Sequence, residues 1–421
     1  MSQFSGYQCS LCGQAYAPDE VIYTCPKDGG NLDVILDYAN VERQMSPEKL
    51  WRSPEAGLWR YLSLLPVADP AGWDTPFRAA GGTPLFAVPR LAAALGLEQL
   101  WIKDESRNPS ASFKDRASAV VVARAGEIGA EVVVTASTGN AGAALACMAA
   151  AVGQKAIIFA PRTAPPAKIA QLLVFGAQVI LVDGTYDDAF DLTIQAAHEF
   201  GWYCRNTGYN PFTAEGKKTA ALEIWEWWER AGKKERAEQP SDLCPPLSVF
   251  VSVGDGNIIS GLHKGFKDLQ RLGWMAQMPR IFGVQAEGSA AIANAFAAGS
   301  ETIVPVSAKT LADSISVDLP RDGVRAVRAA RQTGGAYLVV SDADILAAIA
   351  ALGPVGIFAE PAGAAAYAGL VKAVGLGLIE PSDPVVVINT GSGLKDIKAA
   401  MQAVPEAAII EPRLEAVKKL L

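Results

Sequence analysis

The sequence lacks the features that mark nucleic-acid-binding and membrane proteins. Lysine and arginine together number 37 against 44 acidic residues, so the formal net charge is −7. This balance argues against a surface for nucleic acid or another polyanion. No apolar stretch is both long enough and free enough of charge to cross a bilayer. We therefore expect neither nucleic acid nor a membrane as a partner.

Signals for secretion are also missing. The first ten residues, MSQFSGYQCS, have no basic region followed by an apolar one, which a secretory signal would need. Six cysteines in 421 residues do not resemble a disulfide framework. A cytoplasmic location, where thiols stay reduced, is therefore expected. Half of the residues are apolar and 19% are charged, which is typical of a globular protein with a large core.

Residues 1–38 have a cysteine spacing that small zinc ribbons use. Cys9 and Cys12 form a C-x2-C pair, and Cys25 opens a second such turn, in which Asp28 stands where a fourth cysteine would be expected. Three thiolates and one carboxylate can hold zinc. The alternative is a degenerate ribbon held by packing alone, and the sequence leaves both open. In either case this segment is predicted to be an appendage outside the reactive centre.

The rest of the chain has the period of a doubly wound α/β fold. After an irregular lead-in over residues 39–80, apolar runs alternate with helical stretches, which predicts mostly parallel strands. The predicted strands are 100–102, 131–135, 155–160, 178–182, 248–253, 281–284, 336–340 and 385–388. The first four predicted helices are 113–125, 141–152, 167–175 and 187–200.

A polar break at residues 231–246 interrupts this period and suggests two lobes with a cleft between them. We predict a catalytic unit over residues 81–405 and a C-terminal tail over 406–421. Within the unit, the small lobe covers about residues 110–210, and the large lobe is formed by residues 81–109 and 211–405.

Three turns follow predicted strands, where a doubly wound fold binds its ligands. The backbone amides of residues 137–140, Ser-Thr-Gly-Asn, open a helix and could bind a carboxylate. Those of residues 254–257, Gly-Asp-Gly-Asn, could cradle a phosphate. Thr390 could offer a neutral hydroxyl to a ring nitrogen. Viewed singly, each could instead be an ordinary turn or helix cap.

A lysine at a predicted helix start is the fourth feature. Lys114 lies in the string Ser-Phe-Lys-Asp-Arg, among small and hydroxyl residues. The positive end of a helix and partial burial both lower the pKa of a lysine, as a Schiff-base nucleophile requires. A lysine in this place could instead be solvated. Together with the three turns, however, the string favours a reactive amine.

In this order the motifs resemble fold-type II pyridoxal-phosphate enzymes, closest to the threonine synthases. The resemblance extends from about residue 80 to residue 398 and rests on the motifs at 81–85, 112–116, 137–140, 254–257, 360–362 and 390–396. It implies a homodimer in which Lys114 carries the cofactor covalently. The implied cofactor-binding residues are Lys114, Asn140, Gly254, Asp255, Gly256, Asn257 and Thr390. The implied substrate-binding residues are Ser137, Thr138, Gly139 and Thr213.

The substrate end departs from the family pattern. A threonine synthase converts O-phospho-L-homoserine and water into L-threonine and phosphate, and it usually has an arginine for the substrate phosphate where Thr213 stands. Arg205, Lys217 and Lys218 lie nearby in the chain and could replace it, or could be solvated surface charges. The alternative function is a serine or threonine ammonia-lyase, or a replacement enzyme of the cysteate-synthase type. A silent binding protein is disfavoured because Lys114, Asn140 and Thr390 are intact.

Overall fold

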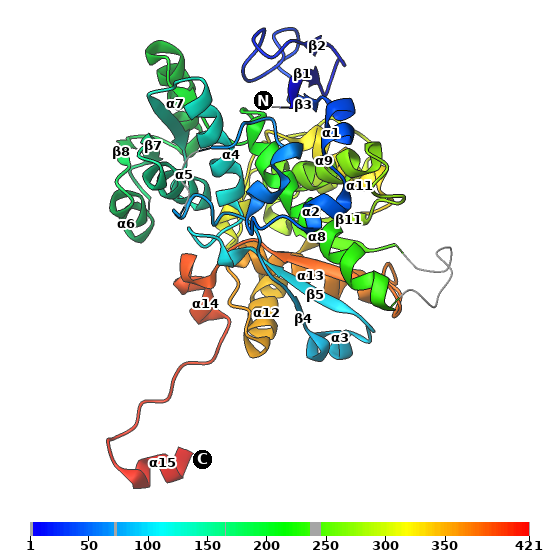
Figure 1. Ribbon diagram of the computed structural model, residues 1–421. Helices are drawn as coiled ribbons and strands as arrows, with labels where there is room; N and C mark the ends of the chain where they lie inside the picture. Colours follow the sequence, from blue (N-terminus) through cyan, green and yellow to red (C-terminus); the bar gives the residue numbers. More distant parts are fainter. Residues whose placement is uncertain (1–2, 71–73, 165, 236–245, 421) are drawn as a thin grey trace.

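The computed structural model describes residues 3–70, 74–164, 166–235 and 246–420. Its strands form three sheets, two of which are built mainly from parallel strands joined by helices (Figure 1). The predicted polar break at residues 231–246 falls mostly outside the described residues. Within the described part of the chain, no helix is long and apolar enough to cross a membrane.

The first sheet is a small antiparallel one formed by β1 (Phe4–Cys9), β2 (Ala15–Tyr16) and β3 (Leu32–Leu36), in the order β2-β1-β3. We call residues 3–37 the N-terminal ribbon. The lead-in that follows is less irregular than predicted, because it contains the short helices α1 (Tyr38–Gln44), α2 (Pro47–Trp51) and η1 (Leu58–Leu64). The ribbon lies at the top of the molecule in Figure 1.

The second sheet is wholly parallel. Its strands are β6 (Val132–Ala136), β7 (Lys155–Pro161), β8 (Gln178–Val182) and β9 (Tyr203–Cys204), in the order β8-β7-β6-β9. The helices of this region are α4 (Lys114–Glu127), α5 (Asn140–Ala151), α6 (Pro166–Val174) and α7 (Tyr186–Phe200). The central strand β6 reads Val-Val-Val-Thr-Ala and is buried at every position, as a parallel strand covered on both faces must be.

The third sheet has six strands in the order β12-β11-β10-β13-β5-β4. These are β4 (Leu85–Ala87), β5 (Leu100–Asp104), β10 (Ser248–Ser252), β11 (Arg280–Ala286), β12 (Tyr337–Val340) and β13 (Val385–Asn389). All neighbouring pairs are parallel except the edge pair β4 and β5. The α-helices of this region are α3 (Pro89–Leu95), α8 (Phe212–Glu235), α9 (Asn257–Arg271), α10 (Ala291–Ala297), α11 (Gly323–Gln332), α12 (Asp342–Leu352) and α13 (Pro361–Gly375). The short 3-10 helices are η2 (Glu105–Arg107), η4 (Glu287–Ser289), η5 (Asp313–Ile315), η6 (Gly353–Val355) and η7 (Gly393–Lys395).

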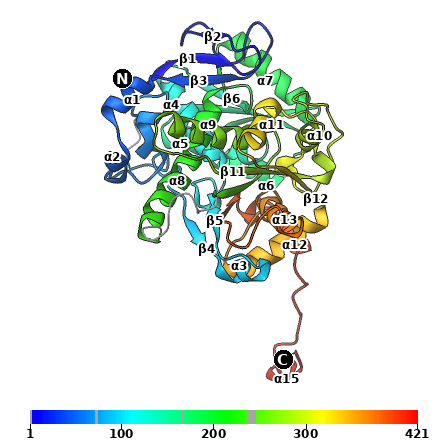
Figure 2. The same cartoon turned by 90° about the vertical axis from the view of Figure 1, so that its right-hand side faces the viewer.

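Every strand and helix predicted in the sequence is present, with ends displaced by at most two residues. The prediction of mostly parallel strands is confirmed, and β4 is the antiparallel exception. After α14 (Ile397–Gln402) the chain leaves the body as an extended tail that ends in α15 (Leu414–Leu420), as both views of the ribbon show (Figures 1 and 2).

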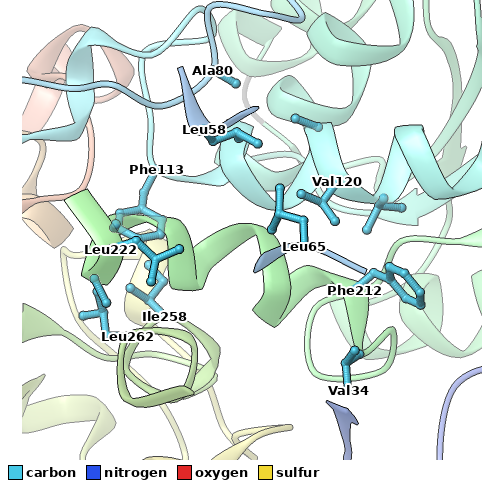
Figure 3. Packing of buried hydrophobic residues seen from close by; sticks show 14 of the residues in the cluster. Val34, Leu58, Leu65, Ala80, Phe113, Val120, Phe212, Leu222, Ile258 and Leu262 are labelled. Carbon is cyan, nitrogen blue, oxygen red and sulfur yellow. The ribbon is translucent and has the colours of Figure 1, made fainter. Parts of the chain in front are cut away.

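The main hydrophobic core joins the ribbon to the rest of the molecule. One buried cluster contains Phe113, the N-cap residue of α4, together with Val120 of α4 and Leu222 of α8. Val34 of β3 belongs to the same cluster and lies beside Phe212 at the start of α8 (Figure 3). Since burying apolar surface is the dominant favourable term in folding, this shared core holds the ribbon against the body.

Candidate active site

A cavity of about 520 Å³ lies between the two parallel sheets. Its walls include residues just past the carboxyl ends of β6, β7, β10 and β13, which is where a doubly wound fold binds its ligands. A pocket of this size suits a small organic ligand. The predicted turns at residues 137–140 and 254–257 both line it, as do Lys114 and Thr390.

Lys114 is the first residue of α4 and is held against the turn after β13. The Phe113 amide donates to the Thr390 carbonyl at 2.9 Å, and Ser112 forms an antiparallel bridge with Gly391. Burial lowers the pKa of Lys114 to about 8, and the Arg205 charge acts in the same direction. With this pKa about a tenth of the amine is neutral, and therefore nucleophilic, at pH 7, far more than for a solvated lysine.

Asn140 begins α5, and its amide donates to both carboxylate oxygens of Glu360, at 2.7 and 3.0 Å. Burial raises the pKa of Glu360 above its ordinary value. Sequence reasoning quoted Glu360 in a motif and gave it no role. Its carboxylate nevertheless lines the cavity beside Asn140. The sequence feature that could have pointed to Glu360 is its position before Pro361, at the start of a predicted alanine-rich helix.

The loop at residues 254–257 connects β10 to α9 and has no room for larger residues. Gly256 has φ +89°, and a Cβ there would lie 2.6 Å from the Asp322 carbonyl oxygen. A Cβ on Gly254 would lie 2.9 Å from Ile315 Cα. Only glycine adopts this backbone without strain, and a loop of this kind turns its amides toward an anion. Burial raises the pKa of Asp255, the acidic member of the loop.

Two hydroxyls lie together at the ends of central strands. Thr390 Oγ1, just after β13, is 3.4 Å from Ser252 Oγ at the end of β10. Both side chains are buried and both line the cavity. Ser252 was not predicted as a site residue from the sequence, although its position at the end of a predicted strand could have indicated it. On the opposite sheet, Ser137, Thr138 and Gly139 line the cavity before α5.

The basic residues near Thr213 divide into two groups. Arg205 and Lys217 are fully buried and line the cavity, so a solvated surface role is wrong for them. Lys218 is also fully buried, but it pairs with Glu215 and with Asp268. Lys217 therefore faces the cavity while its neighbour serves an internal ion cluster.

Thr213 does not line the cavity. Its hydroxyl donates to Asn210 O at 2.7 Å and lies 3.1 Å from Asn257 Oδ1. The same Asn257 oxygen accepts a hydrogen bond from Lys217 Nζ at 2.5 Å. The structure thus places Thr213 and Lys217 against the last residue of the 254–257 loop.

Arg205 has unused hydrogen-bonding capacity. Its Nε and Nη1 donate to Ser118 Oγ at 3.2 Å and to Thr207 Oγ1 at 2.6 Å. Its buried Nη2 has no hydrogen-bond partner among the described residues. Burial lowers the pKa of Arg205 to about 10. A buried donor of this kind is costly unless an anion satisfies it.

The four predicted metal ligands of the ribbon also come together. One ligand atom from each of Cys9, Cys12, Cys25 and Asp28 lies within 4.8 Å of all the others. The Gly30 amide donates to Asp28 Oδ1 at 2.9 Å and orients that carboxylate. Three thiols and a carboxylate in this arrangement suit a tetrahedral Zn²⁺ ion. The cluster lies in the ribbon and is separate from the cavity.

Comparison with known proteins decides the family. A family model described as pyridoxal-phosphate dependent enzyme matches residues 77–391. The chain belongs to this family. Threonine synthase from Methanocaldococcus jannaschii is 39% identical over 98% of this chain and 98% of its own. Threonine synthase from Methanosarcina acetivorans is 37% identical with the same coverage of both chains. The predicted resemblance to threonine synthases is thus confirmed, and the protein is a pyridoxal-phosphate dependent enzyme that acts on a small molecule.

Solved structures of pyridoxal-phosphate enzymes share the fold. Threonine deaminase isoform 2 from Solanum lycopersicum has a TM-score of 0.64 at 24% identity, covering 81% of this chain and 92% of its own. A diaminopropionate ammonia lyase from Escherichia coli has a TM-score of 0.64 at 21% identity, covering 86% and 93%. The predicted fold class, a fold-type II α/β enzyme with a ribbon-like N-terminal segment, is confirmed. The glycine loop, the Lys114 amine and the strand-end hydroxyls fit the cofactor's phosphate, aldehyde and ring.

Proposed function

We propose that this enzyme is a threonine synthase, which converts O-phospho-L-homoserine and water into L-threonine and phosphate. Its similarity to two threonine synthases over 98% of the chain supports this reaction. The observation that carries the proposal is a cavity with two buried basic side chains besides Lys114, namely Arg205 and Lys217. A site for a phosphorylated cofactor and a phosphorylated substrate needs this additional positive charge.

The cofactor end is assigned as follows. Lys114 would hold the cofactor covalently, the amides of residues 254–257 would bind its phosphate, Asn140 would bind its 3′ oxygen and Thr390 would face its ring nitrogen. Bound pyridoxal phosphate supplies an electron sink for the amino acid's α-carbon. A neutral hydroxyl beside the ring nitrogen keeps that sink mild, which suits elimination and replacement.

The protein's own groups move protons and hold the substrate. With the cofactor bound, the Lys114 amine would remove the substrate proton at Cα and would move protons at Cβ. Its pKa of about 8 matches that task near neutral pH. Ser137, Thr138 and Gly139 bind the substrate carboxylate at the positive end of α5.

Two phosphates require a division of labour among the cations. Lys217 is bonded to Asn257 of the glycine loop, so it is assigned to the cofactor phosphate. Arg205 keeps one free donor in the cavity and is assigned to the substrate phosphate. Thr213, which stands where the family pattern usually has an arginine, supports Asn257 in this assignment.

The test is the Arg205→Gln variant assayed with two substrates. Loss of a charge-assisted contact worth roughly 1.5–3 kcal/mol should raise KM for phosphohomoserine about 10- to 100-fold. The KM for L-serine, which carries no phosphate, should change little and serves as the control. Threonine and phosphate should appear in equal amounts from the wild-type enzyme. An unchanged KM contradicts the role of Arg205.

The alternative is an ammonia-lyase or a replacement enzyme with an unphosphorylated substrate. Thr213 favours it, because such an enzyme needs no arginine at this position. Release of ammonia and a 2-oxoacid from serine or threonine, with no threonine formed from phosphohomoserine, would establish it instead.

Four further assignments complete the proposal. A zinc ion is bound by Cys9, Cys12, Cys25 and Asp28. The enzyme is a homodimer and is located in the cytoplasm. The catalytic unit spans residues 81–405, with the four-stranded sheet in its small lobe.

A further inference from the structure

We propose that the N-terminal ribbon is part of the anion-binding machinery of the active site. Its Tyr23, Asn31 and Asp33 hold the chain segments that carry Arg205 and the 254–257 loop. The inference rests on the proposed cofactor pocket and adds to it a set of positioning residues from outside the catalytic unit. Three independent contacts support it.

The first contact is made by Asn31, whose amide nitrogen donates to two carbonyls. One is Gly208 O and the other is Arg321 O, at 3.1 Å. These carbonyls come from segments more than a hundred residues apart that touch one another, since a Cβ on Gly208 would lie 2.6 Å from Arg321 Cβ. Asn31 therefore hydrogen-bonds to both the segment after β9 and the segment before α11 and holds them together.

Both segments lead directly to the cavity. Gly208 follows Thr207, whose hydroxyl accepts the hydrogen bond from Arg205 Nη1. Arg321 lines the cavity, and its amide lies 3.4 Å from Asp255 Oδ1. A shift at the junction would therefore move an anion-binding side chain on one side and the glycine loop on the other.

The second contact is a chain of charged hydrogen bonds that begins at Asp33. Arg325 donates to Asp33 Oδ1 at 2.8 Å and to both oxygens of the fully buried Asp322, at 2.6 and 2.7 Å. Asp322 in turn accepts a hydrogen bond from the side-chain amide of Asn257, at 2.7 Å. Asn257 ends the glycine loop and binds Lys217. Each link is charge-assisted, and all but the partly exposed Asp33 end are buried, so the chain fixes the loop more firmly than surface bonds would.

The third contact is made by Tyr23. Its ring stacks on Tyr209, with centroids 4.5 Å apart and planes 23° apart. Its hydroxyl accepts a hydrogen bond from the Cys204 amide at 2.8 Å, one residue before Arg205. The ribbon therefore holds the Arg205 segment from both ends, at Cys204 and at Gly208.

The ribbon can do this because its own turns fix the contacting residues. Tyr23 and Asn31 flank the turn that carries Cys25 and Asp28, and Thr24 pairs with Asn31 in an antiparallel bridge. Phe4 packs edge-on against Phe212 at 5.5 Å, and Val34 lies beside the same ring (Figure 3). The ribbon is thus anchored in the core by residues other than those that contact the cavity segments.

The experiment compares Asn31→Ala with Arg328→Ala. Arg328 lies on α11, one turn beyond Arg325, and donates to Ser10 O of the ribbon, but it touches none of the cavity segments. Both variants remove one side chain that joins ribbon and body. The readouts are the dissociation constant of pyridoxal phosphate, titrated into cofactor-free protein by its visible absorbance, and kcat at saturating cofactor.

We expect the dissociation constant to rise about tenfold in Asn31→Ala and to stay within about twofold of wild type in Arg328→Ala. Saturating cofactor should restore kcat in Asn31→Ala, since the catalytic groups are intact. Equal affinities in Asn31→Ala and wild type, or equal losses in both variants, would overturn the inference while leaving the proposed function standing. A wild-type chain that takes up no cofactor would contradict both.

Discussion

At the scale of single residues, Lys114, Arg205 and Lys217 share one cavity and influence one another. Burial lowers the pKa of Lys217 well below its usual value, and the Lys114 and Arg205 charges add to the effect. Lys217 is held by Asn257 Oδ1. The Lys114 amine has no hydrogen-bond partner in the described part of the chain. The Lys114 amine is therefore free to act as the nucleophile, whereas a hydrogen bond to Asn257 holds the Lys217 amine in place.

A first prediction follows from the lowered pKa of Lys114, about 8. Only the neutral amine attacks an aldehyde, and its fraction rises as pH rises through the pKa. The rate at which cofactor-free protein attaches pyridoxal phosphate should therefore rise with pH, with a half-maximum near pH 8. Stopped-flow absorbance measures it. Arg205→Gln removes one cause of the lowered pKa and should move the midpoint upward. A wild-type midpoint near 10.5 would show that the amine is solvated.

At the scale of elements, the ribbon brings four ligands together from two turns. The C-x2-C pair and the Cys25 turn lie at either end of β2, so the three thiols and Asp28 converge without any contribution from the body. The spacing was enough to predict this cluster. The packing of Val34 on Phe212, and the bonds from Asn31 to Gly208 and Arg321, were not predictable, because they join segments with no local pattern in common.

The second prediction concerns this cluster. Purified protein should contain about one zinc ion per chain, and Asp28→Ala should weaken zinc binding by at least about tenfold, since one of four ligands is lost. Asp28→Cys should strengthen it. Elemental analysis after dialysis against a chelator measures both. Asp19→Ala, an exposed acidic residue of the same ribbon, is the control. Equal zinc retention in Asp28→Ala and wild type would mean that Asp28 is not a ligand.

At the scale of the whole molecule, a buried charge cluster joins β5 of the six-stranded sheet to helices α4 and α8. Lys103 on β5, Glu105 after it, Arg116 on α4 and Glu223 on α8 are paired at 2.6–3.7 Å. Arg116 donates to both carboxylates and is fully buried. Removing one partner of such a cluster leaves an uncompensated buried charge.

A third prediction is therefore an acid-sensitive fold. Although burial opposes it, the Arg116 and Lys103 charges lower the pKa of Glu223 to about 2, from 4.5. A carboxyl with a lowered folded pKa contributes stability above its unfolded pKa and loses it as pH falls toward the folded one, here between about 4.5 and 2. Glu223→Gln should remove this dependence and cost about 3–5 kcal/mol of unfolding free energy at neutral pH.

Denaturant unfolding at several pH values measures both effects. Glu229→Gln, on the same helix but outside the cluster, should change the unfolding free energy by less than about 0.5 kcal/mol. If Glu223→Gln lowers the unfolding free energy at neutral pH as little as Glu229→Gln does, the cluster does not stabilise the packing of β5 against α4 and α8.

Sequence reasoning succeeded where the signal was local. The period of apolar runs predicted the strands and helices, and the turns at 137–140 and 254–257 marked the cavity. It did not foresee the antiparallel strand β4, which has only three residues, or the contact between Asn140 and Glu360, which are 220 positions apart. It also could not tell which of Arg205, Lys217 and Lys218 faces the cavity, because only tertiary packing decides that.

The account depends most on which amine carries the cofactor, since two lysines, Lys114 and Lys217, line one cavity. Borohydride reduction of the purified enzyme, followed by peptide mass spectrometry, fixes the cofactor to its attachment site. The account predicts that the label is on Lys114 and is absent in Lys114→Ala. A label on Lys217 in the wild-type enzyme, or no labelled peptide after incubation with pyridoxal phosphate, would contradict it.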